Sequence, residues 1–414
     1  MPATTRRAML TRLALGVPEP DAAHTLVQVF LRGGADTLNL LPPHADDRYH
    51  RLRPSLAIKP PGPAAGAAIR LDDRYALHPE MRPLEAAFKE GRLGAVQAAG
   101  VDNTSGSHFE CQDQMEHGSH PAGPAPGGGW LGRFLRLGAG GAEAGPLAAV
   151  ALGKVLPESL RGAPAASVLE SVDDLALQVP AGRQARVITA LQALYGADVT
   201  LLGGRGVETL HLFRKVSALQ GRADPPANGA QYPDDPFGAA LRELARLIKA
   251  RVGLRIACVD LGGWDTHFFQ GGATGAQAQR IRVLAAGLAA FEQDLRGHSA
   301  RRTVIITTEF GRRVYENASL GTDHGRGYAL LALGDKVAGG RVLGPWPLQA
   351  DDDHNLNTPG PGGLWMHTDC RHLFAEILAA TQGLTPAQAA ALFPGLPPLS
   401  LIHISEPTRQ AEIS

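Results

Sequence analysis

Aspartate, glutamate and histidine side chains recur where apolar segments of this chain end. They occur in the segments RGGAD, GGWDTH, TTEFGR and TDHG. Mixed carboxylate and imidazole ligands suit zinc, manganese or iron better than calcium or magnesium, because imidazole is a borderline-soft ligand. The sequence therefore predicts a site for one or two divalent ions. Zinc is the favoured metal, with manganese or iron as alternatives. The candidate ligands are Asp36, Asp265, His267, Glu309, Asp323 and His324.

Each of these motifs also has an ordinary structural interpretation. An aspartate after a strand is often a turn or helix-capping residue. Asp265 and His267 could cap a loop, and Asp323 with His324 could pair with Arg312 or Arg313. The metal site is favoured because the motifs follow several strands, and parallel strands end at one edge of a sheet.

Ser107 is the candidate nucleophile. It lies in DNTSGSHFECQDQME, after an apolar segment and at the start of a helical stretch. A serine at a helix N-terminus is near backbone N–H groups that favour a phosphate or sulfate, and a nearby metal could activate its hydroxyl. The alternative is a capping box formed with Glu110, which needs no chemistry. His108 and Asp113 share the segment and could line the same site.

Apolar segments alternate with helical patterns from residue 25 onward, which predicts a mostly parallel α/β sheet. The predicted strands are TLVQVFL, LGAVQAAG, LAAVALG, LRIACVDL, RTVIITTE, YALLALG and RVLG. Ile281, Leu284, Leu288, Phe291 and Leu295 repeat at three-to-four spacing, which indicates an amphipathic crossover helix. Capped helices are predicted at PEMRPLEAAFKEG and CRHLFAEILAATQG.

The composition excludes several classes of protein. Forty basic residues balance 40 acidic ones, which removes the electrostatic case for a nucleic-acid or membrane-surface protein. No apolar run reaches about 18 residues, so no membrane span is predicted. Three widely spaced cysteines, Cys111, Cys258 and Cys370, form neither a disulfide framework nor a zinc ligand series.

We expect one domain over residues 25–398, with a mostly helical insertion at about 155–222 over the sheet. The segment 1–24 contains Arg6-Arg7 and resembles a degenerate twin-arginine export signal. The location is cytoplasmic as the sequence stands, or periplasmic if that signal is functional or truncated. The tail 399–414 resembles translated sequencing-adapter read-through, with an ordinary polar tail as the alternative.

Taken together, the motifs resemble domain-of-unknown-function family 1501. The matching segments run in order from about Thr25 to Pro394 and are FLRGGADTLNLLPP, RLRPSL, SHFECQDQMEHG, GGWDTH, TTEFGRR, TDHGRGYALLALGDKVAGGRVLG and FPGL. That family is placed in the alkaline-phosphatase-like superfamily with sulfatases and phosphomutases. The resemblance implies a three-layer α/β/α sandwich with a mostly parallel sheet, and usually a two-metal site. The family has no settled activity, and many members carry a twin-arginine signal.

By similarity to that superfamily, Asp36 takes the metal-ligand position after the first strand and Ser107 that of the nucleophile. Asp265, His267 and His324 then build one metal site.

The remaining motif fits the superfamily pattern in two registers. One places Glu309 and Phe310 where the superfamily has Asp and His. The other gives Asp323 and His324 to the second metal. Both lack one imidazole, unless a histidine nearer the C-terminus supplies it, either His354 or His367.

The sequence thus favours a metal-dependent hydrolase that acts on a small anionic phosphate or sulfate ester. Ser107 or a water attacks, and Arg32 or Arg312 holds the anionic oxygens; the alternative for each arginine is a salt bridge to a neighbouring carboxylate. The competing hypothesis is a non-catalytic or single-metal relative that acts as a binding module. A dinucleotide oxidoreductase is disfavoured, because no G-x-G-x-x-G follows the first strand. The sequence does not indicate the oligomeric state.

Overall fold

The structure is a computed structural model, which describes residues 24–346 and 363–396. Short gaps within these ranges fall at 102, 104, 121–125, 139–144, 146, 176–178, 181, 199–205, 208, 211–212, 214–215, 218–224, 299–300 and 335. The twin-arginine-like segment, His354 and the tail 399–414 therefore lie outside the described residues.

A mixed sheet of nine strands runs through the middle of the described part of the chain. Its strand order is β10-β4-β9-β8-β1-β7-β5-β6, and β11 also pairs with β4. β9 is antiparallel to both of its neighbours, whereas the other pairs are parallel. The strands are β1 His24–Arg32, β4 Leu93–Gly100, β5 Ala149–Leu152, β6 Ser167–Leu169, β7 Ile256–Gly262, β8 Arg301–Thr307, β9 Tyr328–Gly334, β10 Val342–Leu343 and β11 Thr368–Asp369, while β2 Ile69–Arg70 and β3 Ala76–Leu77 form a separate hairpin.

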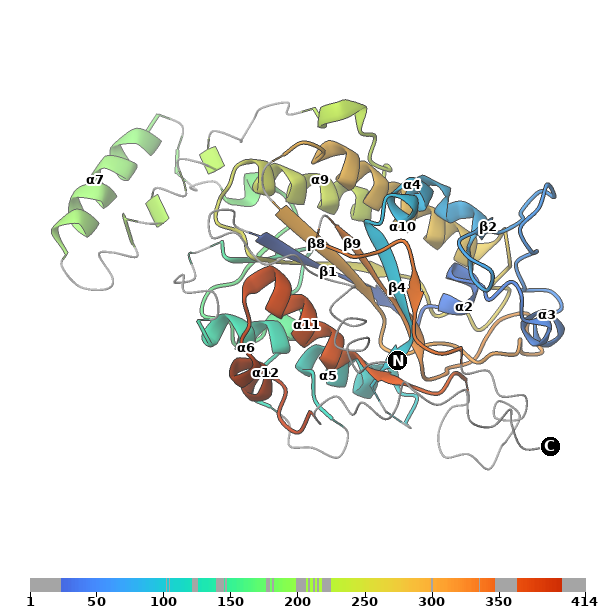
Figure 1. Cartoon of the computed structure of the whole chain (residues 1–414). Helices are drawn as coiled ribbons and strands as arrows, with labels where there is room; N and C mark the ends of the chain where they lie inside the picture. Colours follow the sequence, from blue (N-terminus) through green and yellow to red (C-terminus); the bar gives the residue numbers. More distant parts are fainter. Residues whose placement is uncertain are drawn as a thin grey trace.

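Helices cover both faces of the sheet, which makes three layers (Figure 1). One face carries α4, α9 and α10 with the short 3-10 segment η1, and the other carries α5, α6, α11 and α12. The α-helices are α2 Thr37–Leu40, α3 Asp47–Leu52, α4 Glu85–Lys89, α5 His108–His117, α6 Trp130–Arg136, α7 Gln184–Ala197, α9 Pro236–Lys249, α10 Ala276–Asp294, α11 Cys370–Gln382 and α12 Pro386–Leu392; the 3-10 helices are η1 Pro79–Leu84, η2 Glu158–Leu160, η3 Val172–Leu175 and η4 Ala227–Gly229.

The burial of the strands explains why they read as continuous apolar runs. In β1, Val27, Val29 and Leu31 pack into the core under α9 and α10, and Leu26 and Phe30 pack into the core under α6 and α11. A strand covered on both faces has no position for a polar side chain except where it makes a specific hydrogen bond. The predicted three-layer sandwich with a mostly parallel sheet is confirmed.

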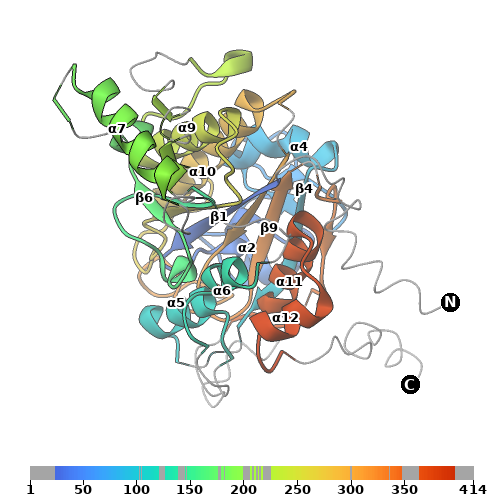
Figure 2. The same cartoon turned by 90° about the vertical axis from the view of Figure 1, so that its left-hand side faces the viewer.

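One predicted helix differs from the sequence expectation. PEMRPLEAAFKEG forms the 3-10 helix η1 followed by α4, with Pro83 inside η1, rather than one capped helix. The segment at 155–222 includes β6, which extends the sheet beside β5, as well as η2, η3 and α7, and the helical insertion expected there stays a prediction. Its helix α7 buries none of its residues and stands away from the sheet in Figure 1; in Figure 2 that side faces the viewer and α7 lies in front. No described helix is long and apolar enough to cross a membrane.

The pairing register brings the carboxyl ends of three central strands together. Arg32 at the end of β1 is paired with Gly262 of β7, and Phe30 is paired with Thr307, the last residue of β8. The loops that follow these strands therefore start at the same edge of the sheet. They contain the RGGAD, GGWDTH and TTEFGR motifs.

The loop after β1 is anchored by a buried ion pair. The Asp36 carboxylate accepts from the Arg53 guanidinium at 2.6 and 3.1 Å, and both side chains are fully buried. Gln270 donates to the same carboxylate at 2.7 Å. Asn39 also accepts from Arg53, at 2.9 Å. Asp36 therefore fixes the first turn after β1 against the segment around Arg53.

We predict that Asp36→Asn destabilises the fold by about 3–5 kcal/mol, because it leaves the buried Arg53 charge uncompensated. Denaturation in urea measures the change. Asp73→Asn, at a fully exposed ion pair with Arg70, is the control and should change stability by less than about 0.5 kcal/mol. An unchanged midpoint for Asp36→Asn would contradict the structural role of this pair.

Candidate metal centre

Close backbone contacts hold the three strand-end loops together. Gly33 has φ +119°, and a Cβ there would lie 2.6 Å from the backbone N of Asp265. Its own N–H donates to Glu309 Oε1 at 2.8 Å. Thr308 bridges the first and third loops, because its hydroxyl donates to Leu31 O and accepts from Ala35 N. Only glycine permits this approach at position 33.

Arg312 ties these loops to the one that carries His324. Its guanidinium is buried and donates to backbone carbonyls on three sides and to the Asp265 carboxylate at 2.6 Å. A short antiparallel bridge pairs Arg312 with His324 and brings that histidine to the sheet edge. The carbonyl acceptors of Arg312 belong to Gly33, Gly34, Trp264 and Thr322.

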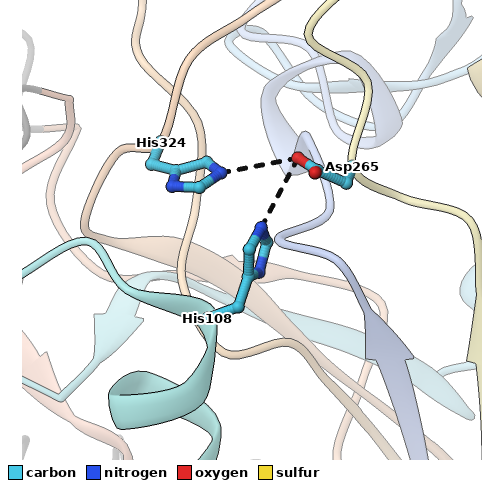
Figure 3. A group of neighbouring side chains, drawn as sticks. All are labelled: His108, Asp265 and His324. Carbon is cyan, nitrogen blue, oxygen red and sulfur yellow. Dashed lines mark hydrogen bonds and ion pairs between the residues drawn. The ribbon is translucent and has the colours of Figure 1, made fainter.

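Three imidazoles surround one oxygen of Asp265. Figure 3 shows His108 and His324 on two sides of this carboxylate. Asp265 Oδ1 lies 3.5 Å from His108 Nε2, 3.4 Å from His324 Nε2 and 3.1 Å from His267 Nε2. His267 Nε2 and His324 Nε2 are 2.9 Å apart. Ligand atoms of His108, Asp265 and His324 all lie within 4.8 Å of one another.

The other ring nitrogen of each histidine faces an oxygen. His108 Nδ1 is 2.8 Å from Glu309 Oε1, and His267 Nδ1 is 3.0 Å from Asp323 Oδ1. His324 Nδ1 is 2.7 Å from the carbonyl oxygen of Gly106. A carbonyl or an ionised carboxylate only accepts, so each Nδ1 carries the proton. In the neutral rings, the three Nε2 atoms then present lone pairs to Asp265.

Several hydrogen-bond acceptors, the Nε2 lone pairs and the Asp265 oxygen, therefore lie close together. The lone pairs of His267 and His324 face each other at 2.9 Å and share a carboxylate oxygen. Arg312 already donates to that oxygen at 2.6 Å, but the facing Nε2 lone pairs of His267 and His324 need a shared cation or added protons between them. Ligand atoms bound about 2.0–2.1 Å from one zinc ion at angles of 90–109° lie roughly 2.9–3.4 Å apart, which is close to the separations here. The donor set therefore fits a single borderline metal ion.

Local electrostatics keep the carboxylates ionised. Burial opposes the charge on Asp265, but the hydrogen bond and charge of Arg312 outweigh it and hold the pKa of that carboxyl below its usual value. For Glu309, burial is again outweighed, here by hydrogen bonds from His108 and Gln112, and its pKa is lowered. The pKa of Asp323 is lowered because hydrogen bonds from Asn317 and His267 outweigh burial.

The histidines differ from one another. The hydrogen bond to Glu309 raises the pKa of His108. Burial lowers the pKa of His324, which favours the neutral ring that can bind a metal.

The structure gathers some of the predicted site residues and separates others. Asp265, His267 and His324 come together. Glu309 and Asp323 instead contact the Nδ1 atoms of His108 and His267, on the side of each ring away from Asp265. Such outer carboxylates orient metal-binding histidines and fix their tautomer.

Asp36, Arg312 and Arg32 have different positions from those expected. Asp36 is held by Arg53, outside the cluster. Arg312 uses its donors within the protein and positions Asp265 instead of facing an anion. Arg32 pairs with Glu116 at 2.8 Å and with Asp260 at 3.0 Å, which is the salt-bridge alternative.

Ser107 is the N-cap residue of α5, but its side chain makes no capping hydrogen bond. The capping box with Glu110 is therefore not formed. Ser107 directly precedes the candidate ligand His108 in the chain.

His108 supplies the imidazole that both sequence registers lacked. Phe310 packs against its ring at 4.9 Å between centroids and against His324 at 4.6 Å, so it forms an apolar wall rather than a ligand. His367 is exposed and lies next to β4. The sequence signal for His108 was its place in SHFECQDQME, in the loop that follows a strand and at the first turn of a helix.

The family model described as "Protein of unknown function (DUF1501)" matches residues 23–359. No curated protein matches the chain in sequence. Among solved structures, the chain is similar to the C-terminal periplasmic domain of EcEptC from Escherichia coli, in complex with Zn. The identity is 8% and the TM-score is 0.34, over 78% of this chain and 76% of that one. Similarity at this level gives no information about the site. Membership of the alkaline-phosphatase-like superfamily, which the sequence led us to expect, stays a prediction.

We predict that Asp323→Asn weakens zinc binding about 10- to 100-fold, because His267 loses the carboxylate that orients it. Competition with a fluorescent chelator measures the affinity. Asp323 is about half exposed, so the fold should be retained; Asp73→Asn is again the control. Equal zinc affinity in Asp323→Asn and the parental protein would exclude this role.

Proposed function

Because the chain belongs to the DUF1501 family, whose function is unknown, we propose an activity from the site itself: a metal-dependent hydrolase of phosphate or sulfate esters. One observation carries the proposal. Three histidines whose Nδ1 atoms are engaged by oxygens direct their Nε2 atoms at one carboxylate oxygen. A structural role for Asp265 alone would not require three imidazoles in this orientation.

His108, His267, His324 and Asp265 would hold the ion, with zinc as the first choice and manganese or iron as alternatives. A bound ion of this kind polarises an ester oxygen and lowers the pKa of a coordinated water. The described residues gather one set of ligands rather than two, so we propose one ion. Asp265 is about half exposed, which leaves the centre accessible to a small substrate.

The first turn of α5 is placed to receive the anionic part of the substrate. Its backbone N–H groups lack partners within the helix, and the helix dipole favours negative charge there. Ser107 stands at this end of α5 with a hydroxyl that does not cap the helix. We propose Ser107 as the nucleophile, and an attacking water as the alternative. Because Arg32 and Arg312 are committed to carboxylates and carbonyls, these N–H groups replace them as anion donors.

We predict about one equivalent of zinc, manganese or iron in protein purified without chelator or histidine tag. His324→Ala and His108→Ala should each lower metal affinity and hydrolysis of 4-nitrophenyl phosphate or 4-nitrophenyl sulfate by more than about 100-fold, because each removes a ligand rather than an outer partner. His50→Ala, whose ring bonds to the backbone oxygen of His44, is the control.

Ser107→Ala separates the two nucleophiles. Loss of turnover with unchanged metal content supports the serine, and turnover at the parental rate supports water. Metal binding without turnover of any ester would favour a single-metal binding module. Absence of bound metal after reconstitution would exclude the hydrolase.

A further inference from the structure

Exposed aromatic side chains border the candidate metal centre. Phe109 directly follows His108 and is 89% exposed; Phe268 directly follows His267 and is 69% exposed. Phe269 is 75% exposed. The other large exposed apolar side chains in the described part of the chain are Leu137, Val155, Leu156, Val168, Leu194, Leu320 and Trp365. Three of the four exposed phenylalanine and tryptophan side chains thus lie within two residues of a candidate ligand. Single exposed apolar residues are ordinary, but aromatic residues beside candidate ligands require an explanation.

Two of the apolar residues at this border also have unfavourable backbone conformations. Phe269 has φ +46° and Leu320 has φ +58°. Bulky residues rarely adopt positive φ, because the side chain crowds the backbone. The pair lies side by side, since Phe269 N donates to Ser319 O and Gln270 N donates to Leu320 O. Strain of this kind gathers where function requires a particular side chain.

The strained pair is attached to the candidate ligands. Asn317 donates to His267 O and to Asp323 Oδ1, each at 3.0 Å, and its own oxygen accepts from the backbone of Ser319 and Gly321. The turn that presents Leu320 is thus built on the outer carboxylate of the centre. The aromatic ring of Phe268 lies 6.3 Å from that of His267.

From this juxtaposition we propose that the substrate is an amphiphile: a monomeric phosphate or sulfate ester whose alcohol part is a hydrocarbon chain. Phe109, Phe268, Phe269 and Leu320 form an apolar rim that contacts the chain while the anion lies at the centre. Hydrolysis would consume water and release the hydrocarbon alcohol and the inorganic anion. The proposal rests on the proposed function.

The occupant of the rim follows from its position. In an ester of this kind one bond joins the hydrocarbon to the anion. The anion would therefore lie at the metal ion while the hydrocarbon contacts the apolar rim beside it. Contact with the rim removes hydrocarbon from water, and this contribution grows with chain length.

The experiment compares methyl, butyl and hexyl esters of phosphate and of sulfate with zinc-loaded protein. Calorimetry measures the dissociation constant, and release of phosphate or sulfate measures kcat/KM. For the parental protein we expect affinity and kcat/KM to rise about two- to fourfold per methylene, as expected for partial to full burial of each group.

The variant Phe269→Gly/Leu320→Gly removes both side chains and places glycine where φ is positive. We expect the chain-length dependence to fall by at least half, with the methyl ester values, the zinc content and the thermal midpoint preserved. Phe109→Ser tests the rim residue that follows His108 on α5 in the same way. Leu194→Ser removes an exposed side chain on α7 and is the control.

The outcomes separate this proposal from the hydrolase itself. Chain-length-dependent binding without hydrolysis supports the rim and excludes the hydrolase. Hydrolysis that is independent of chain length supports the hydrolase and overturns the rim. If the double variant instead converts a dimer to a monomer in size-exclusion chromatography and leaves chain-length dependence intact, the rim is a contact between copies and the proposal is wrong.

Discussion

The candidate centre depends on one buried guanidinium. Arg312 donates to carbonyls on the loops after β1 and β7 and on the loop before His324, and it also holds Asp265. A buried arginine is tolerated only when its donors are satisfied, and these carbonyls in turn would lack partners without it. Loops from distant parts of the chain are therefore constrained together. His267 and His324 can converge on Asp265 because the loops that carry them cannot separate independently, whereas His108 comes from α5 and is oriented by Glu309.

The protonation pattern of the centre follows from its outer contacts. Glu309, Asp323 and the Gly106 carbonyl each engage an Nδ1 atom, so each Nε2 lone pair is directed inward. Three Nε2 atoms thus face one carboxylate oxygen that also accepts from Arg312, while Asp265 stays half exposed. This combination differs from a structural hydrogen-bond network, in which donors and acceptors alternate. It is the arrangement expected where a cation completes the site.

Two similar motifs have different surroundings in this fold. RGGAD follows β1 and GGWDTH follows β7, and each places an aspartate after two glycines. Asp36 is fully buried against Arg53, whereas Asp265 is half exposed among histidines. The difference arises because Asp36 is enclosed by Arg53 and Gln270, whereas Asp265 accepts from Arg312 on one side and faces the histidines on the other.

The apolar rim adds a second property to the same loops. The turn around Leu320 and the residues after His267 hold bulky side chains in solvent at a conformational cost. Such side chains weaken neither the sheet nor the two cores, because they lie on loops outside them.

The sequence by itself determined the layer architecture and the edge at which polar residues gather. Continuous apolar runs at β1, β7 and β8 require cover on both faces, and parallel strands present their following loops at one edge. Asp265, His267 and His324 were predicted on this basis.

Only the tertiary structure decided which candidates meet. His108, from α5, joins the cluster. Glu309 and Asp323 contact the Nδ1 atoms of histidines. Asp36, Arg32 and Arg312 form ion pairs within the protein. Some of these assignments depend on contacts between residues more than 200 positions apart, such as His108 with Glu309 and Arg32 with Asp260, and others on nearer pairs such as Asp36 with Arg53. Local patterns carry no information about such distances, because a carboxylate after a strand is chemically the same whether an arginine or a histidine packs against it.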